Sequence, residues 1–470
     1  MFDLVIRGGS VVGPERAERA DLGVTDGVIA AVSAPGEALE GQIDIDATDR
    51  LVLPGLVDAH AHIPGYILSH RFDDFRTATS AAALGGVTTV MLMPTDDPRT
   101  ATADYFDRKR HSGEGQSLVD FAIQALIGPK TEQAVVEEMA ARGAVSFELF
   151  LAYGGTPEFI IGNDDYELQR LMQLVHDVGG IVGVTPHSAT LIAKLTALQK
   201  ESQEDYRRLE SSRRVDRSER VEPPNPVELF ALTRPTLSEA LGIARACTVA
   251  SETGTRIHLR ALSSRRSIEM VRRFRDAVAL SSEVMSHHLL FTDCDAVRFG
   301  PYGIIVPPLR TAAERDALRK AVKAAEIDMA VSDHSPALRE DKELGWADIW
   351  QTPPGMPGLQ TLFHSMLTLV DDGVLTLSDV VRVCAERPAA CFGLYPRKGA
   401  LLKGSDADIV ILDTRQSMLI DDQCQQSKAN YTTLKGRLVK GRIDSVYLRG
   451  ELVAQDGQIV SRPTGRFVRP

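Results

Sequence analysis

The chain has 470 residues, 43% hydrophobic and 25% charged, so it can bury a large core and is not intrinsically disordered. Its net charge of −11 argues against a nucleic-acid partner, because such proteins usually carry a basic face. No uncharged apolar stretch of about 18 residues occurs, so we expect no membrane span. The five cysteines form no CxxC pair and no secretory leader precedes them, so we expect a reduced, cytoplasmic protein.

The two ends of the chain share one pattern of short apolar runs and tight turns. Residues 1–56 contain an Asp26-Gly27 turn between apolar runs, which is typical of a β-hairpin. Residues 395–470 repeat the pattern around Asp456-Gly457. We expect both ends to combine into one small β-sandwich domain. Two independent sheet caps are the alternative, although each end alone has few strands to cover a face.

The middle of the chain, residues 57–394, alternates apolar runs with helical patterns. This alternation favours the α/β class and a (β/α)8 TIM barrel, whose chemistry lies at the carboxyl ends of its strands. An open doubly wound sheet is the alternative, but no GxGxxG turn supports it. The strand candidates are 87–92, 121–123, 146–150, 181–184, 256–262 and 329–332, and the helix candidates are 131–142, 166–178, 237–252 and 312–325.

Residues 199–226 depart from this alternation, since they are dense in charge and then rich in proline. A solvated helix followed by a connector accounts for the pattern. A mobile lid over the mouth of the barrel is the functional alternative.

Two histidines follow the first apolar run of the middle segment, in Gly55-Leu-Val-Asp-Ala-His60-Ala-His62. Residues at i and i+2 on a strand point to the same face, so both imidazoles can bind one ion. Packed or surface histidines are the alternative. We predict that His60 and His62 are metal ligands at a strand end.

A carboxylate stands at the end of a late apolar strand, in Val331-Ser-Asp333-His-Ser-Pro336. In that place Asp333 can bind a metal ion and take a proton from the water that the ion activates. A turn or helix cap before Ser335-Pro336 is the alternative. We predict that Asp333 is both a ligand and the catalytic base.

Segments spread over the whole chain resemble those of one group of enzymes. The residues in question are "VIRGG" (5–9), "PGLVDAHAH" (54–62), "AAALGGVTTVMLMP" (81–94), "PPLRT" (307–311), "SDHSP" (332–336) and "FGLYPRKGALLKGSDADIVILD" (392–413). Together they are similar to the cyclic amidohydrolases of the amidohydrolase superfamily, the hydantoinase, dihydropyrimidinase, allantoinase and dihydroorotase group. The resemblance implies a metal-dependent (β/α)8 barrel with a β-sandwich, assembled as a homodimer or homotetramer. It also implies that Tyr153 hydrogen-bonds the substrate's developing oxyanion.

The sequence departs from this group at three ligand positions. The resemblance implies two ions held by the histidine pair, a carboxylated lysine, one histidine from each of the next two strands, and the aspartate. Here Glu148 stands at the lysine position, and Thr185 and Ala261 stand at the two histidine positions. Because both histidines of the second ion are missing, we expect one divalent ion per chain, zinc or manganese.

Glu148 and His187 are further candidate ligands. Glu148 is shorter than a carboxylated lysine by three bonds, roughly 3–4 Å, so a hydrogen-bonding wall residue is the alternative. Two facing carboxylates also need a cation between them, or one must take up a proton. His187 lies two residues beyond the expected histidine, an offset that preserves its facing on a strand, although Pro186 makes regular strand geometry doubtful there.

Other polar residues near these positions receive smaller roles. His258 has the opposite parity to Ala261, so we expect it to pack outside the barrel, and we expect His287 and His288 to be structural. Arg310 resembles a family position near the substrate, but an arginine there can also brace loops. Val306 replaces a polar residue that hydantoinases carry, which points to an unusual pocket.

These features together predict a hydrolase that opens a cyclic amide, imide or ureide C–N bond on a small-molecule substrate. Asp333 activates the water and later protonates the leaving nitrogen, while Tyr153 stabilises the oxyanion. Other chemistry on the same site, such as deamination, remains an alternative. A non-catalytic relative that serves as an interaction or assembly platform is another, motivated by the lost ligands.

Overall fold

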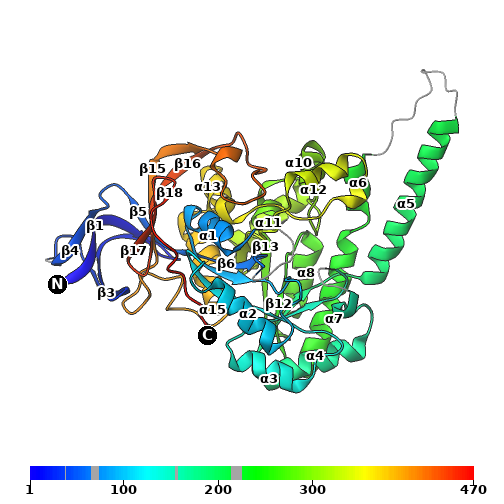
Figure 1. Ribbon diagram of the computed structural model, residues 1–470, viewed down its shortest axis with the longest axis horizontal. Coiled ribbons are helices and arrows are strands. Elements are labelled where there is room, and N and C mark those ends of the chain that lie inside the picture. The colour runs from blue at the N-terminus through cyan, green and yellow to red at the C-terminus, as the bar shows by residue number, and fades with distance from the viewer. Residues whose placement is uncertain (38, 65–72, 154–156, 213–224) are drawn as a thin grey trace.

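The computed structural model describes residues 1–37, 39–64, 73–153, 157–212 and 225–470. Its strands fall into two groups, a barrel built from the middle of the chain and a sheet that lies beside it (Figure 1).

The barrel consists of parallel strands that follow one another in chain order. Hydrogen bonds join β6 to β7 and β8, and join β9 through β14 in sequence. A parallel bridge between Ala61 and His334 connects β6 with the chain just after β14. Counting β9 as the continuation of β8, eight strand positions are present among the described residues, and the predicted (β/α)8 barrel is confirmed. The strands are β6 (Leu56–Ala61), β7 (Val87–Leu92), β8 (Asp120–Ile123), β9 (Ala125–Leu126), β10 (Phe147–Phe150), β11 (Ile181–Thr185), β12 (Arg256–Leu259), β13 (Leu280–Met285) and β14 (Met329–Val331).

Amphipathic helices surround the strands. In α4 (Asp165–Asp177), Leu168, Leu171, Met172 and Val175 are buried, a spacing that puts one apolar stripe against the sheet. The four helices predicted from the sequence correspond to α3, α4, α7 and α11. Besides α4, the α-helices of the described residues are α1 (Phe75–Leu84), α2 (Ala103–Gly113), α3 (Gln133–Ala141), α5 (Ala189–Ser212), α6 (Pro226–Leu232), α7 (Thr236–Thr253), α8 (Arg265–Phe274), α9 (Ser286–Leu290), α10 (Asp293–Phe299), α11 (Ala312–Lys323), α12 (Arg339–Glu343), α13 (Leu362–Asp371), α14 (Leu377–Val381) and α15 (Arg387–Cys391).

Two strands differ from their sequence predictions. Strand β13 was not predicted, because Ser281, Ser282 and Glu283 interrupt its apolar run with buried or half-buried polar residues. Strand β12 ends at Leu259, earlier than expected, and Ala261 has a left-handed backbone with φ 52°. The alternation of side chains between the two faces of the strand therefore ends before Ala261, and it cannot be used to predict which way residues on either side of Ala261 point.

Strands from both ends of the chain form one sheet, as predicted. Strand β15 pairs antiparallel with β5, and this pairing joins the two ends within a nine-stranded sheet of the described residues. A separate apolar core mixes residues from both ends, among them Leu22, Val52 and Ile409. The strands are β1 (Phe2–Val12), β2 (Ala17–Thr25), β3 (Val28–Ser33), β4 (Gly41–Asp46), β5 (Leu51–Pro54), β15 (Ile409–Leu419), β16 (Leu438–Leu448), β17 (Glu451–Gln455) and β18 (Gln458–Ile459).

The charge-dense segment begins as a helix. Helix α5 extends outward from the barrel, and Gln203 on it accepts a hydrogen bond from the Trp350 indole at 2.8 Å (Figure 1). Residues 213–224, where the proline-rich part of the lid hypothesis falls, lie outside the described residues.

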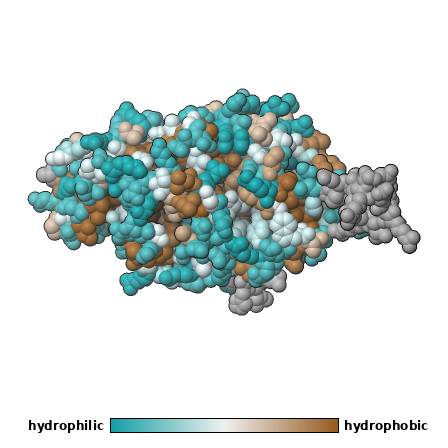
Figure 2. Space-filling view, turned by 90° about the horizontal axis from the view of Figure 1, so that it is seen from above, coloured by the Kyte–Doolittle hydropathy of each residue, from teal (hydrophilic) through white to brown (hydrophobic). Residues whose placement is uncertain are grey.

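The visible surface carries no large apolar band. Figure 2 shows a face on which hydrophilic residues predominate and hydrophobic ones form small separate groups. Within the part of the chain that the structure describes, no helix is long and apolar enough to cross a membrane.

Candidate metal centre and active site

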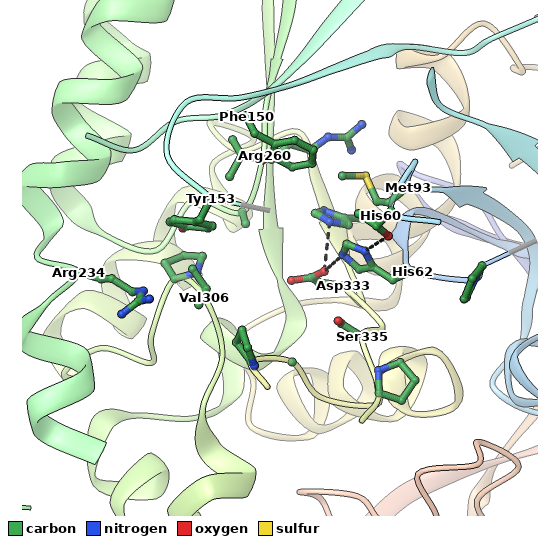
Figure 3. A pocket seen from close by; sticks show the side chains of 18 of the residues that line it. His60, His62, Met93, Phe150, Tyr153, Arg234, Arg260, Val306, Asp333 and Ser335 are labelled. Atoms are coloured by element: carbon green, nitrogen blue, oxygen red, sulfur yellow. Dashed lines mark hydrogen bonds and ion pairs between the residues drawn. The ribbon is translucent and has the colours of Figure 1, made fainter. Parts of the chain in front are cut away.

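Two histidines and one aspartate converge at the carboxyl ends of β6 and β14 (Figure 3). The Asp333 Oδ1 atom lies 3.1 Å from His60 Nε2 and 2.9 Å from His62 Nε2. Potential ligand atoms of all three side chains lie within 4.8 Å of one another. Two imidazole nitrogens and one carboxylate oxygen are a suitable donor set for a catalytic zinc-type ion that keeps a further position open. The donors fit a divalent metal ion.

Hydrogen bonds fix the orientation of both imidazole rings. The Nδ1 atom of His60 lies 2.5 Å from Glu283 Oε1, and that of His62 lies 2.8 Å from the Thr95 hydroxyl. Their Nε2 atoms are left facing Asp333, the arrangement typical of histidine ligands. Burial disfavours a charged His60, but the carboxylates of Asp333 and Glu283 outweigh it and raise its pKa to about 9.

A buried carboxylate ties the histidine strand to the aspartate strand. Asp58 Oδ1 accepts hydrogen bonds from the Ser332 backbone amide at 3.1 Å and from the His60 amide at 3.3 Å. The Ser332 hydroxyl donates to its other oxygen. Asp333 itself has a left-handed backbone with φ 43°, so these contacts hold an uncommon conformation that aims its carboxylate at the histidines.

Near these ligands, Arg260 is fully buried between two glutamates. Its Nε and Nη2 atoms donate to Glu148 at 3.0 and 2.6 Å, and its Nη1 atom donates to Glu283 at 2.9 Å. The Ala59 carbonyl, 3.1 Å from Nη1, and the Gln124 side chain also accept from it. The guanidinium is thus a fixed positive charge, linked to His60 through Glu283.

These groups open onto a cavity of about 380 Å³. His60, His62 and Asp333 lie at one side of it, and Tyr153 and Arg234 lie at the other (Figure 3). Apolar walls complete the lining, among them Met93, Phe150, Val306 and several prolines. A cavity of this size accommodates a small ring with a short substituent.

The comparisons with known proteins identify the family. A family model described as the amidohydrolase family matches residues 51–453. The chain belongs to the amidohydrolase family. It is 32% identical to L-hydantoinase of Paenarthrobacter aurescens over 471 residues, covering 100% of this chain and 98% of that protein. It is 34% identical to allantoinase of Rubrobacter xylanophilus over 479 residues, with coverage of 100% and 98%. The solved structure of L-hydantoinase (dihydropyrimidinase) from Arthrobacter aurescens matches with a TM-score of 0.92 at 31% identity, covering 100% of both chains. The family and the enzyme class predicted from the motifs are confirmed.

In this amidohydrolase, Glu148 has other partners than a metal ion. Both of its carboxylate oxygens accept from Arg260, and the Ser146 hydroxyl donates to it at 2.7 Å. A Cβ atom at Gly183 would lie 2.2 Å from the carboxylate, so only glycine leaves room for it. The structure therefore differs from the predicted ligand role of Glu148, because Arg260, which the sequence analysis did not consider, is the cation beside it.

His187 also lies apart from the three converging ligands. It is buried, its ring lies 4.7 Å from that of Tyr153, and neither nitrogen has a partner among the described residues. Burial, reinforced by the charges of Arg310 and Arg234, holds its pKa well below the ordinary value. The close approach of Gly242 on α7 to the backbone of Pro186 and His187 fixes it beside Tyr153 rather than beside Asp333.

Tyr153 lines the cavity, as expected, whereas Arg310 lies behind the cavity wall. The Tyr153 hydroxyl has no partner among the described residues, and burial raises its pKa well above the ordinary value. Arg310 donates to the Ser263 hydroxyl at 3.1 Å and to the Arg234 carbonyl at 2.7 Å. These contacts favour the bracing role that the sequence left open for Arg310 over substrate binding.

The three histidines that received smaller roles are buried, and one of them faces a different way than expected. His258 was predicted to pack outside the barrel, yet its Nε2 atom lies 2.9 Å from Glu283, on the side of Arg260. The prediction failed because it counted parity from Ala261, beyond the end of the strand. His288 bonds the Pro308 carbonyl at 3.2 Å, and His287 is buried beside it.

Sequence reasoning missed Arg260 and Glu283. Two signals were available, an arginine at i+2 from His258 in a buried run and a glutamate within the stretch before His287-His288. Neither signal predicts the ion pairs by itself, because the pairing becomes visible only when the barrel brings β10, β12 and β13 together.

Proposed function

We propose that this amidohydrolase opens a cyclic amide, imide or ureide C–N bond with one divalent ion, zinc or manganese. The convergence of His60, His62 and Asp333 at the carboxyl ends of two barrel strands carries the proposal. The names of the relatives, an L-hydantoinase and an allantoinase, support the class of bond. Val306 in the cavity wall, where hydantoinases carry a polar residue, supports a substrate other than hydantoin itself.

The side chains suit each step of such a hydrolysis. A divalent ion held by the three ligands would polarise the substrate carbonyl and make water a stronger acid. Asp333 accepts one proton as the water oxygen attacks the carbonyl carbon. The Tyr153 hydroxyl, which has no partner among the described residues, donates to the oxyanion that develops there. Asp333 then returns its proton to the leaving nitrogen as the C–N bond breaks, yielding a carboxylate and a ring-opened amine or amide.

The surroundings of Arg260 support one ion rather than two. A permanent positive charge already lies next to His60 through Glu283, and Glu148 is fully engaged with it. Thr185 and Ala261 line the cavity where the family resemblance implies histidines, and neither supplies a nitrogen ligand. A second divalent ion would therefore meet a guanidinium and lack ligands.

Metal content is the test of this proposal. Elemental mass spectrometry on protein purified without chelators should find about one ion per chain, and His60→Ala should lose it. His176→Ala, at an exposed site on α4, is the matched control and should keep the ion. The metal-loaded protein should hydrolyse at least one member of a panel of hydantoins, dihydropyrimidines, lactams, imides and ureides. Two ions per chain, or no turnover across the panel, would contradict the proposal.

A further inference from the structure

The lining of the active-site cavity is unevenly charged. Among the described residues, three arginines line it, Arg99, Arg234 and Arg260, and Asp333 is the one carboxylate in the lining. Glu148 and Glu283 neutralise Arg260. The electrostatic surroundings of each of the other two arginines decide whether the cavity has charge left for a ligand.

Arg99 and Arg234 differ in this respect. Asp96, Asp97 and Glu158 all lie close enough to favour the charged form of Arg99. Within the described residues, Arg234 has no carboxylate at ion-pair distance, and burial together with the charge of Arg310 lowers its pKa. Arg310 itself has Glu239 at 3.9 Å. Among the described residues that line this cavity, Arg234 is therefore the uncompensated cation.

Several contacts fix the position of the Arg234 guanidinium, but they do not use all of its hydrogen-bond donors. It belongs to the short connection between α6 and α7, where its amide donates to the Ala231 carbonyl at 3.0 Å. Its Cζ atom lies 4.0 Å from the centre of the Phe230 ring, and Nη1 donates to the Thr233 hydroxyl at 2.6 Å. The buried Nε atom has no partner, although buried donors in proteins are nearly always paired. Stacking and backbone contacts thus pre-organise a donor that lacks an acceptor.

Arg234 lies across the cavity from the candidate metal ligands, with Tyr153 beside it (Figure 3). The charge of Arg234 acts on the Tyr153 hydroxyl, and so does that of Asp333, so the phenol lies within electrostatic reach of both sides. A small substrate whose carbonyl meets His60, His62 and Asp333 therefore extends past Tyr153 toward Arg234.

We propose that Arg234 binds a carboxylate substituent of the substrate, so that the enzyme acts on cyclic amides that carry a negative charge away from the scissile bond. The inference rests on the proposed function, whose substrate class it narrows. A guanidinium matches a carboxylate through two parallel hydrogen bonds. One uncompensated guanidinium balances the single charge of a carboxylate, whereas a phosphate would bring a charge nearer two.

Two matched probes test the inference, hydantoin-5-acetate and the neutral hydantoin-5-acetamide, which differ only in charge. Binding is measured by isothermal titration calorimetry and turnover by kcat/KM. The wild-type protein should prefer the carboxylate by about 30-fold or more, as expected for a buried charge-assisted pair. Arg234→Met should abolish the preference, so that the ratio of the carboxylate values to the carboxamide values falls to about one. Arg234→Lys, which keeps the charge but not the planar fork, should retain part of it.

Arg99→Met is the control, because it removes an arginine of the same cavity that already has acidic neighbours. It should leave the preference within about threefold of wild type. Equal binding of both probes by the wild type, or loss of the preference in Arg99→Met rather than in Arg234→Met, would overturn the assignment. Hydrolysis of the carboxamide without any carboxylate preference would refute this inference alone. Arg234-dependent binding of the carboxylate without turnover of any panel compound would refute the proposed hydrolase and keep the anion site.

Discussion

The cavity wall around Tyr153 and the junction between barrel and sheet both bury polar groups. The buried groups at the junction have partners of opposite charge, whereas several of those in the cavity wall have no partner among the described residues. At the junction, Lys398 is fully buried and reaches Asp120 at 2.5 Å, Asp406 at 2.8 Å and Asp408 at 2.9 Å. Arg449 adds a bond to Asp120, and its amide donates to Asp408 at 2.9 Å. Each charge there has partners of the opposite sign.

In the cavity wall, by contrast, the Tyr153 hydroxyl, both nitrogens of His187 and the Nε atom of Arg234 are buried without partners among the described residues. Burying such groups unpaired costs free energy, so a protein that retains them gains something else from their position. We infer that buried polar groups with partners stabilise the fold, and that buried polar groups without partners indicate where a ligand binds. The following changes test that contrast, beginning with the largest expected effect.

Removing the central cation of the junction should destabilise the fold without affecting the metal centre. Lys398→Met leaves Asp120 and Asp408 buried without their shared partner, which we expect to lower the free energy of unfolding by about 3–5 kcal/mol. Chemical denaturation measures the loss, and metal content should stay at the wild-type value. Lys403→Met, at an exposed site nearby, should change stability by less than about 0.5 kcal/mol. A stable Lys398→Met protein would show that the junction does not depend on this network.

Removing an unsatisfied group from the cavity wall should have the reverse effect. Tyr153→Phe deletes a hydroxyl that has no partner in the described part of the chain, so the free energy of unfolding should not fall. We expect kcat to drop by about 10²–10³-fold, the loss typical of one oxyanion donor. Steady-state kinetics on the best panel substrate, with thermal unfolding in parallel, checks both parts. A destabilised variant with normal kcat would assign Tyr153 a purely structural role.

Glu283 connects the two kinds of network, because it pairs with Arg260 and also orients His60. Glu283→Gln keeps the shape but weakens the hold on the His60 ring, so metal affinity should fall by about 10–100-fold. Competition with a chelating dye measures the affinity. Glu269→Gln, half-exposed on α8, is the matched control and should bind metal normally. Unchanged affinity in Glu283→Gln would mean that His60 needs no such support.

The smallest expected effect is the pH dependence of the free energy of unfolding that a buried lysine causes. Lys342 is fully buried, bonds only the Ile304 carbonyl at 3.2 Å among the described residues, and burial lowers its pKa to about 7. Between pH 7 and about 10 the unfolded chain binds a proton that the folded chain lacks, so stability rises with pH there. The free energy of unfolding of the wild type should rise relative to that of Lys342→Met by up to about 1.4 kcal/mol per pH unit.

If the two proteins show parallel stability curves between pH 7 and 9, the lysine stays charged when buried. The comparison also explains why Arg234 needs a ligand, since a lysine can release its proton on burial and an arginine cannot.

Much of this molecule follows from the sequence. Alternating runs predict the barrel, and His60, His62 and Asp333 could be placed together because each ends a strand of the same barrel. The Glu148–Arg260–Glu283 network could not be predicted, since its members come from β10, β12 and β13 and their pairing depends on the arrangement of strands around the barrel. Glu148 was assigned to a metal for that reason, with its true counter-charge 112 residues further along the chain.

The fit between Gly183, Glu148 and Arg260 has an evolutionary consequence. Any side chain at residue 183 collides with the glutamate, the arginine without Glu148 loses one of its two carboxylate partners, and the glutamate without Arg260 loses the cation that pairs with it. Each single replacement is therefore harmful, although a joint replacement need not be. Descendants of this protein should keep all three residues or lose them together, because a replacement at one position alone disturbs the other two.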